Sequence, residues 1–158
     1  MTQWIAFQGE IKQIQPLTSG NGCNLMVSVE DQTGTPVNFI VTPATYVVGQ
    51  TILLPGDLVT GWYDGSRPAI LIYPPQFEAL VMAKQSANYQ VKVDFFNENL
   101  ESSDGMLKLN PTEATEHLLP NGQAFYGNIA NRNLIVLYGP STKSIPAQTI
   151  PYQIIVLC

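Results

Sequence analysis

Short runs of alternating apolar and polar residues recur along this chain, and turn-forming residues separate them. Twelve glycines and twelve prolines are spread over the 158 residues, so no stretch carries the periodicity of a long helix. Apolar runs of this length between regular turn signals are typical of small β-barrels and β-sandwiches. The sequence therefore predicts an all-β protein with minor α content.

The first half of the chain predicts five strands. The run IAFQGEIKQI (5–14) has Gly9 at its centre, which indicates a bulge or a sharp bend. Residues 24–42 predict a hairpin, because apolar residues alternate inward on both sides of a turn in which Gly34 tolerates a positive φ. A connection over 43–55 has room for one helical turn at most. The last two strands are expected at 56–64, with Leu58, Thr60 and Trp62 on one face, and at 77–84.

This order of strands is that of an OB-fold, with a coiled first strand and a connection between the third and the fourth. The sequence therefore predicts a five-stranded OB-like barrel at residues 1–86. Residues 84–92 are polar and form a candidate link between this barrel and the second half of the chain.

Residues 88–158 predict a smaller β-rich unit, packed on the first, with one short helix. Strands are expected at 89–96, 106–110, 131–139 and 153–158, and PNGQ (120–123) predicts a turn. The helix is expected at PTEATEHLL (111–119), where Pro111 suits the first helical position and Glu113 and Glu116 suit the early turns. No convincing repeat of the first half is found in this half. The alternatives of a second barrel and an extension of the first sheet stay open.

Two of these segments carry a family resemblance. GDLVTGWYD (56–64), followed by PAILIYPPQFEALVMA (68–83), resembles uncharacterised OB-fold-like proteins of Gram-positive bacteria, in which a G-D-x-V-x-G-x-Y-D strand leads to a P-L-I-Y-P-P-Q segment. This chain differs by Trp62 before the tyrosine and by Ala69-Ile70 where Pro-Leu is common. The second half, from LKLN to STKSIPAQTIPYQIIVL, is similar to the same group. The resemblance implies a fold and implies no activity.

Charge argues against several classes of partner. Seven basic residues against twelve acidic ones give a net charge of −5, whereas nucleic-acid binding depends on several Lys or Arg at the phosphates. A nucleic-acid partner is therefore not expected. The chain starts without the basic and apolar segments of a signal peptide and has no membrane-spanning run, which predicts a soluble, cytoplasmic protein. Cys23 and Cys158 are expected to be free thiols.

The stretch YDGSRPAILIYPPQF (63–77) is the leading ligand-site candidate. The loop between the fourth and fifth strands of an OB-fold borders the ligand face, and here Arg67 offers a cation while Trp62, Tyr63 and Tyr73 offer stacking surfaces. The competing interpretation is structural: AILIY is apolar enough to pack across a barrel end as a clasp, with Pro74-Pro75 fixing its exit. We favour the clasp, with Arg67 paired to Asp64.

An acidic loop supplies the one candidate metal site. Its oxygen donors have the chemistry of a calcium site, but their spacing is not that of an EF-hand, so solvated loop polarity is the favoured interpretation; the donors are Asp94, Asn97, Asn99, Glu101 and Asp104. His117 is the single histidine, and it has no partner in sequence that suggests a triad or a zinc site. No cofactor is indicated.

These observations favour a non-enzymatic binding or interaction module for a protein, peptide or glycan surface. The first alternative is an OB-type binder of single-stranded nucleic acid, which would need Lys12, Arg67 and Lys84 to cluster on the barrel face between its first and fourth strands. The second is a carboxylate-based hydrolase, which would need two carboxylates converging in a cleft. Prolines 140, 146 and 151 predict an extended edge segment, and such edges allow a homo-oligomer.

Overall fold

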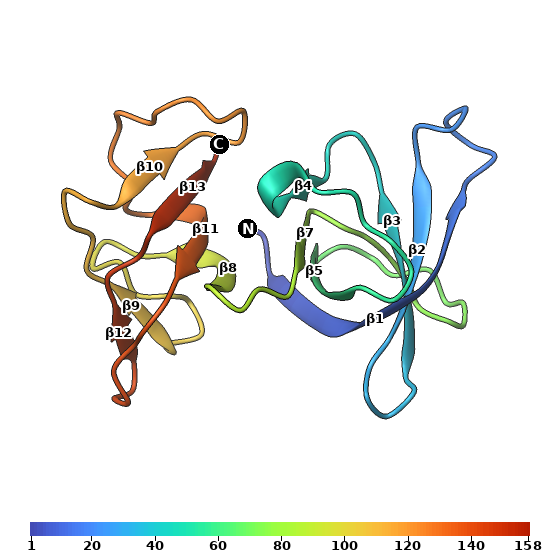
Figure 1. Ribbon diagram of the computed structural model, residues 1–158, viewed down its shortest axis with the longest axis horizontal. Coiled ribbons are helices and arrows are strands. Elements are labelled where there is room, and N and C mark those ends of the chain that lie inside the picture. The colour runs from blue at the N-terminus through green and yellow to red at the C-terminus, as the bar shows by residue number, and fades with distance from the viewer. The chain divides into compact units, whose positions relative to one another are not determined.

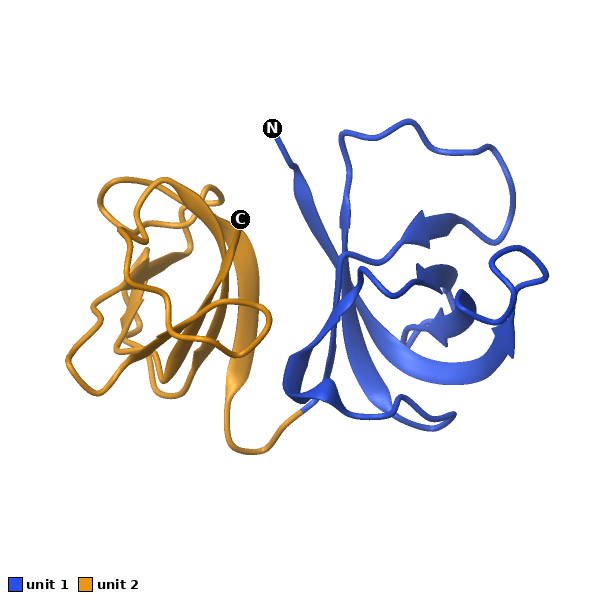
Figure 2. Ribbon diagram, turned by 90° about the horizontal axis from the view of Figure 1, so that it is seen from above, with its two compact units in different colours: residues 1–85 blue, residues 86–158 orange.

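The computed structural model describes all residues from 1 to 158, and its regular structure is β apart from one 3-10 turn. The strands form three open sheets of seven, four and two strands, and there is no α-helix. The all-β prediction is confirmed. The chain divides into two compact units, Met1–Gln85 (unit 1) and Ser86–Cys158 (unit 2), coloured separately in Figure 2. No helix has the length and apolar character needed to cross a membrane.

Unit 1 contains the seven-stranded sheet, in the order β4-β7-β5-β1-β2-β3-β6. Figure 1 labels all of these strands except β6. A 3-10 turn, Val48–Gln50, follows β4 and confirms that the connection over 43–55 holds one helical turn at most. The strands are β1 Trp4–Pro16, β2 Leu25–Glu30, β3 Pro36–Val41, β4 Tyr46–Val47, β5 Leu58–Asp64, β6 Gln76–Glu78 and β7 Val81–Lys84.

The long first strand bends, as expected, so that it pairs with two neighbours. Its first half pairs with β5 and its second half with β2, both antiparallel. A Cβ at Gly9 would clash with the carbonyl oxygen of Glu30, so this position admits only glycine where the backbones of β1 and β2 approach. The register slips between Ile11 and Gln13, a few residues after the predicted bulge.

The predicted hairpin is confirmed as β2 and β3, paired in register around a turn in which Gly34 has φ +84°. Its inward side chains form the centre of the unit 1 core, which Ile11 of β1, Val59 of β5 and Met82 of β7 complete; the hairpin contributes Val27, Val29, Val37 and Phe39. In β5 the side of the strand that faces the core carries Val59 and Gly61. Leu58 lies on the opposite side, the one that the sequence analysis grouped with Thr60 and Trp62, and it is half exposed. A Cβ at Gly61 would lie 2.6 Å from the Phe39 ring.

The segment that we predicted as one last strand divides between two neighbours. β6 pairs in parallel with β3, and β7 pairs antiparallel with β5. At the junction, the Ala79 amide donates to the Ile40 carbonyl (2.9 Å) and the Leu80 amide donates to the Trp62 carbonyl (2.9 Å). The ladders leave β4 and β6 as edges, so the strand pairing forms an open sheet of seven strands and no closed five-stranded barrel.

Unit 2 contains the other two sheets, a four-stranded sheet in the order β10-β13-β11-β8 and the pair β12-β9. The strands expected at 89–96, 106–110, 131–139 and 153–158 are all present. Their apolar side chains form a separate core around Phe96, Leu134, Val136 and Ile154. The strands are β8 Gln90–Phe96, β9 Leu107–Leu109, β10 Glu116–Leu118, β11 Arg132–Tyr138, β12 Ala147–Thr149 and β13 Gln153–Leu157.

The predicted helix at 111–119 is wrong. The Thr115 hydroxyl accepts a hydrogen bond from the Thr112 amide (3.1 Å) and donates one to the Pro151 carbonyl (2.7 Å). The chain therefore turns at 112–115 and continues as β10, parallel to β13. Threonine hydroxyls that bond local backbone groups compete with a helix, and here a tertiary partner completes the competing arrangement.

The two units repeat one pairing scheme, although their sequences show no convincing repeat. The pairs β8·β11, β11·β13 and β10·β13 have the same directions as β1·β5, β5·β7 and β4·β7. The parallel pair β12·β9 likewise matches β6·β3. Single bridges from Ser102 to Phe96 and from Glu101 to Lys108 stand where β2 pairs with β1 and β3 in unit 1.

The same threonine turn supports both units. In unit 1 the Thr45 hydroxyl accepts from the Thr42 amide (3.0 Å) and donates to the Ala79 carbonyl (2.7 Å). Thr112, Thr115 and Pro151 occupy the matching places in unit 2. In unit 1 the turn before the edge strand β4 is thus bonded to the chain between β6 and β7. In unit 2 the turn before the edge strand β10 is bonded in the same way to the chain between β12 and β13.

We expect Thr45→Val and Thr115→Val each to lower the free energy of unfolding by about 1–3 kcal/mol, because valine keeps the shape and leaves a backbone amide and a carbonyl unpaired. Both tryptophans, Trp4 and Trp62, lie in unit 1, so urea unfolding followed by tryptophan fluorescence measures the first variant. Amide hydrogen exchange in β11 and β13 measures the second. Thr51→Val, at an exposed threonine, is the control. Unchanged stability in both variants would contradict this role for the turns.

Candidate functional site

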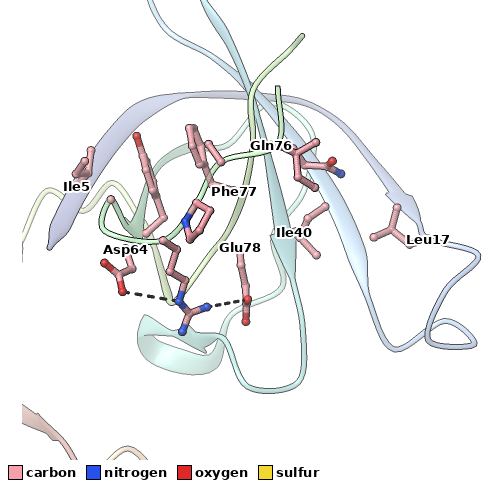
Figure 3. Close-up of a pocket in the computed structure, with 13 residues that line it drawn as sticks. Ile5, Leu17, Ile40, Asp64, Gln76, Phe77 and Glu78 are labelled. Atoms are coloured by element: carbon pink, nitrogen blue, oxygen red, sulfur yellow. Dashed lines mark hydrogen bonds and ion pairs between the residues drawn. The ribbon is translucent and has the colours of Figure 1, made fainter. Parts of the chain in front are cut away.

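A groove of about 500 Å³ opens in unit 1 between the loop after β5 and the strands β3 and β6. Leu17, at the start of the loop between β1 and β2, lines one end, and Ile5 of β1 lines another (Figure 3). The floor and walls are mainly apolar and include Ile40, Tyr63, Phe77, Pro68, Ala69 and Ile70. Segments that are distant in sequence therefore build one surface.

A stacked aromatic pair forms part of the groove wall. The Tyr63 and Phe77 rings lie 3.8 Å apart between centroids and 7° from parallel. Tyr63 also contacts Phe39 of the core, with ring centroids 6.3 Å apart. Burial raises the pKa of the Tyr63 hydroxyl. This pair ties the groove wall to the rigid core of the unit.

The single cation of the groove is half exposed and pairs with two carboxylates. Arg67 lies between Asp64 and Glu78, with Nη1 3.0 Å from the Glu78 carboxylate and Nε 3.7 Å from that of Asp64 (dashed lines in Figure 3). The predicted pairing of Arg67 with Asp64 is confirmed, and Glu78 is a second partner. The guanidinium thus connects the loop to β6.

Asp64 anchors the start of this loop. Its carboxylate accepts hydrogen bonds from the Ser66 hydroxyl (2.6 Å), the Ser66 amide (2.9 Å) and the Gln3 amide (3.0 Å). The Ser66 hydroxyl first, then the two amides and Arg67, lower the pKa of Asp64 to about 2. The carboxylate is therefore ionised at neutral pH and fixed in position.

The expectation that AILIY packs as a clasp is wrong. Leu71 is completely exposed, and the exposed fractions of Ile70 and Tyr73 are 70% and 80%. The two prolines follow this exposed segment and lead into β6, and the Tyr73–Pro74 bond is cis. The loop after β5 therefore presents apolar side chains to solvent beside the groove.

The four ligand candidates from the sequence do not lie together. Tyr63 and Arg67 line the groove. Tyr73 lies outside its lining on the exposed loop, and Trp62 is buried. Sequence inspection missed Ile40, Gln76 and Phe77, which enter the site because β6 pairs with β3, and no local pattern marks that parallel pairing.

The other two basic residues of unit 1 are also paired. Lys12 lies 3.3 Å from the Glu10 carboxylate, and Lys84 lies 3.1 Å from that of Asp57. Neither residue lines the groove with Arg67.

In unit 2 the acidic loop uses its oxygens for its own turns. Asn97 accepts from the amides of Asn99 (2.9 Å) and Glu101 (3.1 Å). The buried Asp94 accepts from the Ser103 hydroxyl (2.5 Å), and Asp104 pairs with Lys92 and accepts from the Ser102 hydroxyl (2.6 Å). These bonds support the interpretation as loop polarity.

No group of three or more His, Cys, Asp or Glu side chains is placed to hold a metal ion. His117 lies in β10, half-buried. Cys23 and Cys158 are free, as expected, and both are exposed.

Comparison of the sequence with models of known protein families and with curated proteins found no match, and comparison with solved structures found none. Function must therefore be inferred from the groove itself.

We expect Ser66→Ala to raise the pKa of Asp64 from about 2 towards its usual value of 3.8, because the hydroxyl is the largest cause of the shift. A lowered pKa stabilises the fold at pH values above the unfolded pKa, and this contribution is lost as pH falls from about 5 to about 2. In the variant, the free energy of unfolding should therefore fall less steeply as pH is lowered through this range. Carboxyl ¹³C NMR titration measures the pKa.

Thr33→Ala is the matched control, because it removes the corresponding hydroxyl from Asp31 (2.7 Å) and leaves the groove untouched. An Asp64 midpoint that Ser66→Ala leaves near 2 would show that the two amides alone hold the carboxylate.

Proposed function

We propose that this protein is a non-enzymatic binding module of OB type, and that unit 1 binds its ligand in the groove between β3, β6 and the loop after β5. The observation that carries the proposal is the place of the groove. In OB-folds the loops after the first and fourth strands and the face of the second and third strands bind ligands. Leu17, Ile40 and the loop 65–75 correspond to those parts in this chain.

The OB assignment is part of this proposal. The segment 76–84 links β3 to β5 through its two halves, which gives the connectivity of a five-stranded OB barrel whose last strand is divided. We propose the same architecture, reduced in size, for unit 2, and membership of the OB-fold-like group that the G-D-x-V-x-G-x-Y-D motif resembles. The pairing scheme common to both units supports the assignment.

Protein or peptide ligands fit the groove best. All three basic residues of unit 1 are in ion pairs with carboxylates, and this arrangement is unfavourable for a phosphate backbone. Asp64 and Glu78 are the two carboxylates of the groove, and both are paired to Arg67. A hydrolase needs one of its two carboxyl groups protonated as a general acid, and Asp64, with a pKa of about 2, does not supply that group. An apolar groove with a few fixed polar groups instead suits side chains of a polypeptide.

A heptapeptide phage library selected on the immobilised protein tests this proposal. We expect selected peptides to lose at least about tenfold in affinity with Ala69→Trp, because the indole fills the groove. Ala44→Trp is the matched control: Ala44 is also an exposed loop alanine of unit 1, and it does not line the groove. Titration calorimetry of one selected peptide against the three proteins gives the affinities.

Two results would count against the proposal. One is a set of selected peptides that Ala69→Trp and Ala44→Trp affect equally. The other is salt-dependent binding of a thymidine dodecamer that Ala69→Trp abolishes, which would favour the nucleic-acid alternative.

A further inference from the structure

The edge of β6 beside the groove has no partner strand. β6 is the last strand of its sheet, paired on one side with β3. The Asn38 amide donates to the Pro75 carbonyl and the Ala79 amide donates to the Ile40 carbonyl, both at 2.9 Å. Because backbone groups alternate in direction along a strand, Gln76 and Glu78 direct their amides and carbonyls away from β3. Both residues line the groove.

Unit 2 shows the same edge covered by its own chain. β12 pairs in parallel with β9 as β6 pairs with β3, and Gln148 stands in β12 where Gln76 stands in β6. The Thr142 amide donates to the Gln148 carbonyl (2.9 Å), and the Gln148 amide donates to the Thr142 hydroxyl (2.9 Å). An antiparallel bridge joins Ser141 to Thr149 alongside. The segment 140–142 therefore occupies, within unit 2, the position that is open in unit 1.

The residue that follows the matching tyrosine of the preceding strand differs between the two units. Tyr63 and Tyr138 occupy matching places at the ends of β5 and β11, and the next residue is Asp64 in unit 1 and Gly139 in unit 2. Asp64 holds Ser66 and the Gln3 amide, and the Gly65 amide donates to the Gln3 carbonyl (2.7 Å), so the loop is tied to the start of β1. Gly139 has no side chain to do this, and a Cβ there would clash with the Tyr152 hydroxyl.

We infer that the open edge of β6 binds an extended polypeptide strand of a partner protein, added antiparallel to β6 at Gln76 and Glu78. The inference rests on the proposed function and specifies its ligand. A polypeptide is the polymer whose donors and acceptors alternate at the spacing of a strand edge, and exposed edges bind peptides by this addition. Thr142 of unit 2 shows which residue fits: a small hydroxyl side chain opposite the glutamine.

The charged side chains of the groove indicate the net charge of the partner strand. Two carboxylates, Asp64 and Glu78, lie there with one guanidinium, that of Arg67. The strand is therefore neutral or basic, and its apolar side chains contact Ile40 and the exposed loop residues Ile70 and Leu71. The sequence Pro140-Ser141-Thr142-Lys143 of this chain, which covers the matching edge in unit 2, is likewise without acidic residues.

Amide hydrogen exchange of the full chain, with and without a phage-selected heptapeptide at saturation, tests the inference. Strand addition should slow exchange at the Gln76 and Glu78 amides by at least about tenfold, since both become hydrogen-bonded. The Gln148 amide is the internal control, because the Thr142 hydroxyl already accepts its hydrogen bond. N-methylation of the peptide amides that face β6 should abolish binding, and N-methylation of the alternate amides should leave affinity within about twofold.

The outcomes separate this inference from the proposed function. One outcome is a peptide that binds the Ala69→Trp variant weakly but leaves the exchange rates of the Gln76 and Glu78 amides as in the free protein. This result would keep the groove as a binding site and overturn strand addition. Binding that tolerates N-methylation at every position overturns it as well. Failure to select any peptide sensitive to Ala69→Trp overturns both.

Discussion

The dipeptide Ala79-Leu80 is the junction on which unit 1 depends, because its four backbone polar groups bond to three other segments. The Ala79 amide bonds to β3 and the Leu80 amide to β5, while the two carbonyls accept from the Thr45 hydroxyl and the Tyr46 amide. Buried backbone groups must be paired, and here their pairing sets the course of the chain between β6 and β7. Both the core and the groove follow from that crossing, since it brings Phe77 under Tyr63.

In unit 2 the matching dipeptide, Pro151-Tyr152, has one backbone hydrogen-bond donor fewer. Pro151 stands at the place of Ala79 and has no amide hydrogen, and its carbonyl accepts from Thr115. The Tyr152 amide donates to the Leu137 carbonyl (2.8 Å), and the Tyr152 carbonyl accepts from the Glu116 amide (3.0 Å). The β9·β12 ladder ends just before this proline, with a hydrogen bond from the Asn110 amide to the Thr149 carbonyl (2.8 Å). Two sequences with little in common thus satisfy one hydrogen-bonding requirement.

Local sequence patterns predicted the parts of this fold that local physics controls. The β2–β3 hairpin has alternation on both strands and a glycine at its positive-φ turn position, so its register was accessible from sequence. Long-range pairing was not accessible in the same way. The helix expected at 111–119 instead became β10 because the Thr115 hydroxyl bonds to Pro151, thirty-six residues away, and the split of 77–84 into β6 and β7 depends on partners in β3 and β5.

The residues of the candidate site likewise fall into those that local sequence predicts and those that it does not. Arg67 and Tyr63 were found because the sequence places them in and beside the loop between the fourth and fifth predicted strands, and the pairing of Arg67 with Asp64 followed from their charges and closeness in sequence. Trp62 was a poor choice, because an aromatic residue on a strand gives no local sign of which face is covered. The apolarity of AILIY favoured burial on average, yet the segment is exposed. Contiguous exposed apolar side chains are uncommon on monomeric proteins, which is why the proposed function rests on this segment and on the unpaired strand edge beside it.

The low charge of this chain determines how such a surface can work. Only 12% of its residues are charged, and the cations of unit 1 are each held by carboxylates of the same unit. For a neutral ligand strand, long-range electrostatic attraction therefore contributes little to association, and salt has little to screen. The affinity of the proposed complex would then come from contact: backbone hydrogen bonds along an edge and burial of side chains such as Leu71. Both act only over the last few ångströms of approach, and both depend on a loop whose position is fixed in advance. Asp64 and Arg67 meet that requirement, because Asp64 bonds to Ser66 and the Gln3 amide while Arg67 pairs with Glu78 of β6.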